Sequence, residues 1–241
     1  METGSNPFPH SWVPFPDVKL MAKDQIILTI GKSDGVNFLL CSKNDKKPLG
    51  SVISMGFEDF ISWFNSNSQE FSNTLLFGEE DFGAWYPESW VGIQEEWLKP
   101  LDPEGNEWNR LAIESGMELH FRFPSIFPEN LNFVPLMAHN AERWLKTNGE
   151  SVRVHRNGNR MEMAVIKDKS IQLHTIFHVE SSNEAAYNCL LLYDQCAIHT
   201  EHVPLVWEGE MDELAWEKLR PFIKKIDTSS SHPWSALSCL I

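Results

Sequence analysis

The sequence predicts a duplicated α/β (α+β) fold, in which two related units each combine a three-stranded antiparallel meander with helices. The order strand, strand, strand, helix, strand, helix occurs twice, from about Asp24 and again from about Ser151. Each copy opens with a glycine-containing turn between strands that alternate apolar and polar residues, as a sheet with one buried face requires. The 241 residues are 42% hydrophobic, which is enough for two small domains with separate cores.

The first copy is predicted at residues 19–147, after an extended arm at residues 1–18 that is rich in proline. Two alternating strands flank a turn at residues 33–35, where Gly35 can adopt a positive φ. A third strand and a helix with apolar residues at helical spacing follow this hairpin. Another helix is predicted at residues 135–146, before the pattern starts again.

An irregular insertion is predicted at residues 78–108, with a short helix near residues 93–98. This stretch contains nine acidic residues and one lysine, together with several tryptophans and prolines. We interpret it as a solvated loop anchored by buried tryptophans. If it has a function, we expect a docking surface, because tryptophan and tyrosine anchor interfaces well. The candidate partner-binding residues are Trp85, Tyr86, Trp90, Glu95, Glu96 and Trp97.

The second copy is predicted at residues 148–227. Asn-Gly at Asn157 and Gly158 lies between alternating runs and is a strong hairpin signal. The third strand of this copy, at residues 171–179, leads through a polar cap into a helix at residues 183–197.

A short strand ending at Gly209 and a last helix capped by Asp212 complete the second copy. In this helix we expect Leu214, Leu219, Phe222 and Ile223 to face inward. Residues 228–241 are predicted to form a loose, serine-rich tail.

Two stretches of sequence carry a resemblance to a known family. They are "LTIGKSDGVNFLLCSKNDK" near the start and "SIQLHTIFHVESSNEAAYNCLLLYDQCAI", which is followed by "VPLVWEGEMDE". Both resemble a family of uncharacterised bacterial proteins with an actin-like ATPase fold, which is a ribonuclease H-like architecture. The resemblance covers most of the chain and implies two related subdomains with a cleft between them. Since the family is a domain of unknown function, it implies no activity.

Working actin-like ATPases hold metal and phosphates with an aspartate and glycines in the first hairpin of each half. In this chain neither hairpin has a carboxylate where its first strand ends, and Asp34 lies within the turn itself. No P-loop and no GxGxxG motif is present. We therefore expect no nucleotide and no other cofactor. The residues that could still approach a phosphate are Gly31, Ser33, Gly35, Asn157, Gly158 and Gly209.

Other candidate chemistry is weak, and we expect no catalytic residue and no metal site. The four cysteines fit no zinc spacing. His174 and His178 lie on one side of a predicted strand but too far apart to share a metal, so we interpret both as surface residues. Carboxylate pairs at residues 79–80 and 95–96, near aromatic rings, leave a hydrolase open as a further alternative.

The net charge of -14 disfavours binding to nucleic acid and favours a protein partner with a basic surface. The sequence contains no run of about 18 apolar residues, so we expect no membrane-spanning helix. The scattered cysteines and the lack of a secretory signal indicate a cytoplasmic protein. The sequence favours a non-catalytic binding or scaffold protein on a degenerate actin-like ATPase fold. The alternative is a divergent ATPase or sugar-kinase-like enzyme that uses the cleft between the subdomains. The oligomeric state stays open.

Overall fold

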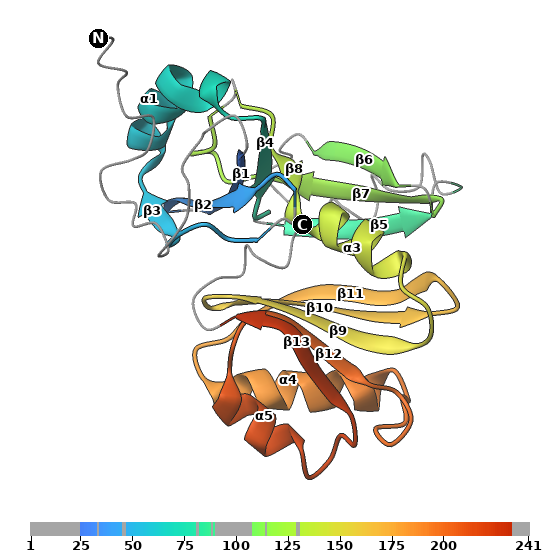
Figure 1. Cartoon of the computed structure of the whole chain (residues 1–241). Coiled ribbons are helices and arrows are strands. Elements are labelled where there is room, and N and C mark those ends of the chain that lie inside the picture. Colours follow the sequence, from blue (N-terminus) through green and yellow to red (C-terminus); the bar gives the residue numbers. More distant parts are fainter. Residues whose placement is uncertain are drawn as a thin grey trace. The chain divides into compact units, whose positions relative to one another are not determined.

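The computed structural model describes residues 25–32, 34–44, 47–80, 82–87, 89, 108–113, 115–128 and 131–232. The chain is a mixed α/β protein that divides between His139 and Asn140 into two compact units (Figure 1). The predicted arm at residues 1–18 and the predicted helix at residues 93–98 lie outside the described residues.

The first unit contains a five-stranded sheet whose first three strands form the predicted antiparallel meander. β1 then pairs with β4 in parallel, and β4 pairs in parallel with β8. The strand order is β3-β2-β1-β4-β8. The bounds are β1 Gln25–Lys32, β2 Gly35–Ser42, β3 Ile53–Met55, β4 Asn73–Gly78 and β8 Val134–Pro135.

A second, antiparallel sheet of the order β5-β7-β6 belongs to the same unit. Its strand β5 (Phe82–Pro87) lies within the stretch that the sequence predicted to be irregular, so that prediction is wrong for these residues. The reason is long-range pairing with β7 (Met117–Arg122), which local composition does not reveal. The remaining elements of this unit are β6 Asn109–Ile113, α1 Phe57–Asn67 and the 3₁₀ helix η2 Ser68–Glu70, and the helix α3 Leu136–Leu145 spans the boundary between the two units.

The second unit repeats the topology of the first sheet in the order β11-β10-β9-β12-β13. Its first three strands form an antiparallel meander, and β12 lies parallel to both β9 and β13. The predicted duplication of the fold is therefore confirmed. The bounds are β9 Ser151–Asn157, β10 Arg160–Lys167, β11 Ser170–His178, β12 Leu205–Glu210 and β13 Ile226–His232. The last strand includes residues that the sequence assigned to a loose tail.

Helices α4 (Ser182–Gln195) and α5 (Glu213–Leu219) cover one face of this sheet (Figure 1). Their apolar residues pack on Val154 and Trp207 of the sheet in one buried cluster. The Ser181 side chain accepts a hydrogen bond from the Glu184 N–H, and Asp212 accepts one from the Ala215 N–H, so both helices begin at side-chain caps.

The buried face of α5 differs from the prediction. Leu219 and Ile223 are buried, but Leu214 and Phe222 are 62% and 59% exposed. Ala215 and Trp216 face the sheet instead. Because α5 ends at Leu219, the helical phase does not continue to Phe222. Among the described residues, no helix is long and apolar enough to cross a membrane.

Candidate functional site

The first candidate turn begins at Gly31, the penultimate residue of β1. Gly31 lies in register beside Gly78 of the parallel strand β4. A Cβ atom at Gly31 would lie 3.0 Å from ring atoms of both Phe127 and Phe133. A Cβ atom at Gly78 would lie 2.6 Å from the rings of Phe123 and Phe127. Phenylalanine rings therefore cover the ends of these two strands.

These rings belong to an aromatic cluster of the first unit. The Phe123 and Phe127 rings are stacked with centroids 4.9 Å apart, and the Phe127 and Phe133 centroids are 5.0 Å apart. The outer side of the cluster lines a pocket of about 600 Å³. Its described lining contains amides and Arg122 but no carboxylate. This pocket therefore lacks the acidic ligand that a metal–phosphate site needs.

Gly35 closes the first turn with a φ of +145°. A Cβ atom there would collide with the backbone carbonyl oxygen of Met55. The glycine therefore allows β2 to approach the end of β3 closely. A pocket of about 410 Å³ beside this hairpin is lined by Lys32 and Asp34 among others. Ser33 lies outside the described residues.

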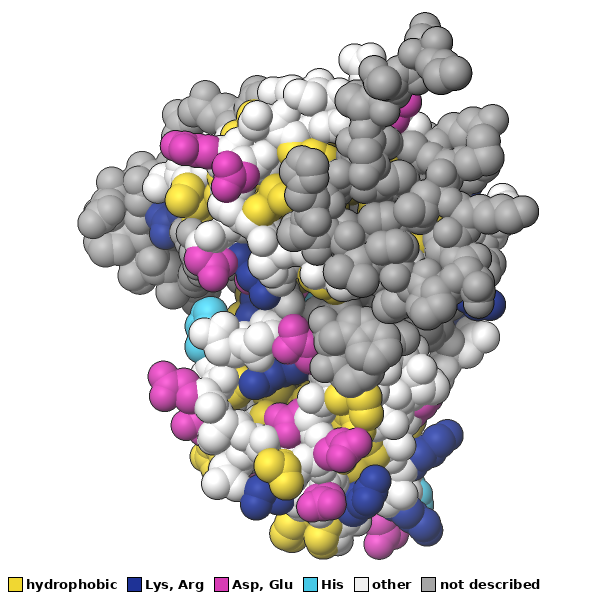
Figure 2. All heavy atoms as spheres, turned by 60° about the vertical axis from the view of Figure 1, so that its left-hand side comes forward, with side chains coloured by type: hydrophobic (Ala, Val, Ile, Leu, Met, Phe, Trp, Pro, Cys, Tyr) yellow, Lys and Arg dark blue, Asp and Glu magenta, His cyan; other side chains and the backbone are white. Residues whose placement is uncertain are grey.

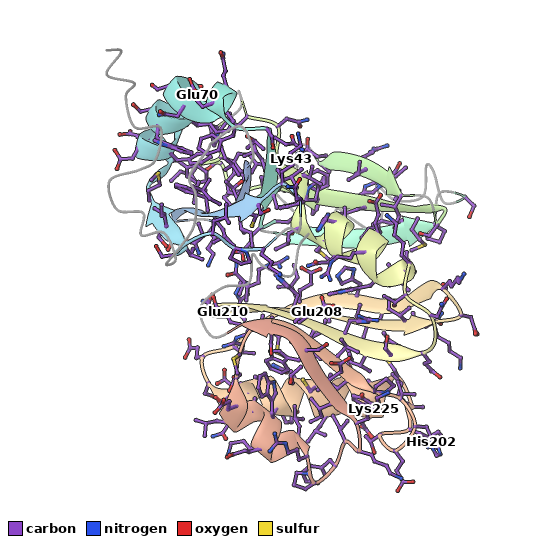
Figure 3. All side chains as sticks on the ribbon, in the orientation of Figure 1. Lys43, Glu70, His202, Glu208, Glu210 and Lys225 are labelled. Atoms are coloured by element: carbon purple, nitrogen blue, oxygen red, sulfur yellow. The ribbon has the colours of Figure 1, made fainter. Side chains whose placement is uncertain are left out.

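The second candidate turn has Gly158 at its tip, with a φ of +61°. Its N–H donates a hydrogen bond of 2.9 Å to Glu210 Oε2. Glu210 is the last residue of β12 and lies at the end of the strand (Figure 3). A phosphate oxygen bound at this turn would need the same N–H donor, so the carboxylate of Glu210 occupies the place that a phosphate would take. The neighbouring Asn157 is buried within the protein.

Gly209, the remaining candidate, has a φ of +83° and pairs with Arg156 of β9. A side chain at this position would collide with the Arg156 carbonyl oxygen. The glycine is thus explained by the close approach of two neighbouring strands.

The second unit also contains a buried ionic cluster that the sequence did not reveal. Glu162 of β10 is fully buried, and its carboxylate accepts hydrogen bonds from Arg160 at 2.7 Å and His174 at 2.8 Å. Burial alone would raise the pKa of Glu162, but the charge of Arg160 and the hydrogen bond with His174 hold it well below its usual value. The prediction that His174 is a surface residue is wrong, since its side chain is fully buried.

A second buried carboxylate belongs to Glu208 of β12 (Figure 3). It has three donors around it. Arg143 pairs with Glu208 Oε2, Arg153 lies 3.3 Å from Oε1, and the Trp144 indole N–H donates at 2.9 Å. Burial lowers the pKa of Arg153, and the charge of Glu208 opposes that shift. Both acids are paired with basic side chains, which is typical of a structural network. Within the described part of the chain, no group of three or more His, Cys, Asp or Glu residues could hold a metal ion.

The predicted docking segment is described only in part. Trp90, Glu95, Glu96 and Trp97 lie outside the described residues. Trp85 is half-buried, whereas Tyr86 is only 8% exposed and is therefore unsuited to anchor a partner. Burial raises the pKa of Tyr86.

Acidic and basic side chains are interspersed on the lower part of the face in Figure 2, so this face is not uniformly acidic.

The carboxylate pair at residues 79–80 has a described role in packing. Glu80 is buried, and its Oε1 accepts a 2.9 Å hydrogen bond from the Met137 N–H in the first turn of α3. This contact satisfies a helix N-terminal donor and places negative charge at the favourable end of the helix dipole. It does not favour a role for Glu80 as a catalytic acid of a hydrolase.

Residues 112–226 match the model of a family described as "Protein of unknown function (DUF3822)". No curated protein sequence matches this chain. Among solved structures, a Bacteroides thetaiotaomicron protein of unknown function with an actin-like ATPase fold superposes with a TM-score of 0.66 at 12% identity. The match covers 88% of this chain and 93% of that one.

The cytoplasmic domain of EpsL, an inner membrane component of the type II secretion system of Vibrio cholerae, is also similar. It superposes with a TM-score of 0.50 at 8% identity, over 90% of this chain and 92% of that domain. At such identities the likeness shows the fold alone. The predicted resemblance to uncharacterised proteins with an actin-like ATPase fold is confirmed.

Proposed function

We propose that this chain is a non-catalytic binding or scaffold protein built on a degenerate actin-like ATPase fold. The observation that carries the proposal is the environment of Gly31. An ATPase of this fold requires a carboxylate near the end of β1, to hold the metal that neutralises phosphate charge. Here the penultimate residue of β1 is Gly31, and the rings of Phe127 and Phe133 fill the space that a longer side chain would need.

The second hairpin supports the same proposal. Glu210 already accepts the Gly158 N–H and adds a negative charge where a phosphate would have to bind. The negative charges of the Glu210 carboxylate and of a phosphate would repel each other, so the turn disfavours binding of a nucleotide. The surroundings of Gly31 and Gly158 therefore disfavour a magnesium–nucleotide complex at these two glycines.

One observation favours the alternative, a divergent ATPase or sugar-kinase-like enzyme. The pocket of about 410 Å³ beside the first hairpin is lined by Lys32, which suits a phosphate, and by Asp34, which suits a metal. An enzyme of this kind would bind nucleotide at that pocket.

Calorimetric titration of the full chain with ATP and magnesium distinguishes the two functions. We expect no saturable heat at millimolar nucleotide. A micromolar dissociation constant that is lost in a Lys32→Ala variant would overturn the proposal in favour of the enzyme. Lys43→Ala, which removes an exposed lysine that does not line the pocket, is the matched control.

For the partner, we infer a cytoplasmic protein with a basic surface that docks on the segment containing Trp90 and Glu95. The net charge of -14 would speed such an encounter at low salt. The similar EpsL domain is a component of a secretion system, which is a precedent for this fold within an assembly. Recovery of the same native proteins by wild type, Trp90→Ala and Glu95→Lys would contradict this docking site.

A further inference from the structure

Strand β11 forms one edge of the second sheet and contains no lysine, arginine, aspartate or glutamate. Its sequence is SIQLHTIFH, and it pairs only with β10 among the described strands. Such an edge presents a row of backbone N–H and C=O groups on its outer side. Edge strands of natural proteins are usually short or are protected by charge, proline or a bulge.

The other described edges differ from β11 in this respect. β3 has three residues and β8 has two, so neither offers a long edge. β5 ends in Pro87, and β6 has five residues and contains Arg110. β13, the opposite edge of the same sheet, contains Asp227. By contrast, β11 runs for nine residues without lysine, proline or acid, and its pairing with β10 shifts register only at Gln172, near the start of the strand. The regular stretch from Leu173 to His178 is therefore suited to pair with another strand.

The two ends of β11 carry opposite charges. The turn before it contains the exposed Lys169, and the exposed Glu180 follows its last residue. In an antiparallel pair of two identical strands, the start of each strand lies beside the end of the other. Lys169 of each copy then comes close to Glu180 of its partner, at both ends of the pair. A parallel pair would instead bring like charges together.

We propose that a second copy of this chain pairs with β11 in an antiparallel arrangement, about a two-fold axis near Thr175. In this register Leu173 lies opposite Phe177 on one face of the joined sheet. Aliphatic–aromatic pairs stabilise adjacent strands, and main-chain hydrogen bonds supply most of the affinity. A two-fold interface closes on itself, so the assembly is a dimer with a continuous sheet and does not grow into a fibre.

Sedimentation velocity of the full chain, over a dilution series at low salt, tests the dimer. We expect a reversible monomer–dimer equilibrium for the wild type. Lys169→Glu places like charges at both ends of the paired strands and should weaken the dimer about tenfold. Glu180→Lys should act similarly. The double variant, Lys169→Glu with Glu180→Lys, restores opposite charges and should recover wild-type association.

Lys224→Glu is the matched control, because it makes the same charge reversal at an exposed residue outside β11. Circular dichroism confirms that each variant is folded. A wild type that remains monomeric throughout the series would overturn the proposal. So would a dimer that Lys169→Glu and Lys224→Glu weaken equally, or a double variant that does not recover association. None of these measurements depends on nucleotide, so their outcome is separate from that of the ATP titration.

Discussion

Gly31 and Gly78 lie side by side in register at the ends of the parallel strands β1 and β4, and the ring of Phe127 covers both. Neither glycine has a positive φ, so neither is required by backbone conformation. Glycine is needed at both positions because there is no room for a side chain, since a Cβ atom at either one would contact the carbon atoms of a phenylalanine ring. Gly31 is thus surrounded by apolar packing, which supports our proposal that the nucleotide site of this fold is degenerate here.

Gly78→Ala should therefore destabilise the protein. The new Cβ would lie 2.6 Å from the Phe123 and Phe127 rings, which are stacked on each other and cannot both move freely. Overpacking of this kind costs about 1–3 kcal/mol of unfolding free energy. Urea denaturation monitored by circular dichroism measures the loss.

Gly56→Ala is the control for Gly78→Ala, because no atom lies within 4 Å of its added Cβ and its φ is -64°. A Gly78→Ala variant as stable as Gly56→Ala would contradict the steric account. In a Phe127→Leu background the penalty of Gly78→Ala should shrink, since part of the clash is removed.

Gly209→Ala should destabilise the protein for a different reason. The residue combines a φ of +83° with a backbone contact to Arg156 that leaves no room for a methyl group. We expect a loss of more than about 2 kcal/mol. Gly158→Asn, at an exposed turn with a φ of +61°, should cost about 1 kcal/mol or less, because asparagine tolerates this conformation. Thermal unfolding measures the loss of stability in both variants. Equal losses would show that the close contact between Gly209 and the Arg156 backbone does not contribute to the effect.

The repeated fold could be predicted because its signals are local. The alternation of β11, the Asn157-Gly158 turn and the Asp212 cap each act within a few residues, and the structure contains all three. Strands β5 and β13 were missed because their pairing with β7 and β12 joins distant segments.

The candidate site was predicted less well for the same reason. The sequence identifies the glycines of both hairpins, but it does not show that Phe127 covers Gly31 or that Glu210 binds Gly158. Likewise, a histidine on an alternating strand looks exposed until the register shows a buried carboxylate beside it. His174 lies opposite Ala164, and its ring reaches Glu162 of the same neighbouring strand.

Glu162→Gln should strongly destabilise the second unit. The substitution removes the charge that compensates Arg160, whose guanidinium is almost completely buried. Breaking a buried pair in this way costs about 3–5 kcal/mol. Glu150→Gln is the matched control, because the pair of Glu150 with Lys167 is exposed and 3.9 Å long, and such pairs contribute about 0–1 kcal/mol. Comparable unfolding midpoints in urea for the two variants would rule out a stabilising role of the buried pair.

The same carboxylate makes the protein sensitive to acid. The folded-state pKa of Glu162 lies below its ordinary value of 4.5, so the unfolded chain takes up a proton at a higher pH than the folded chain does. The stabilisation is therefore complete above pH 4.5 and is lost as the pH falls below it, by about 1.4 kcal/mol per pH unit. Glu162→Gln has no such proton to bind. The unfolding free energies of wild type and variant should therefore converge between pH 5 and pH 3 by about 2 kcal/mol. Urea titrations at several pH values test this directly, and curves that stay parallel across the range would mean that Glu162 does not control the acid response.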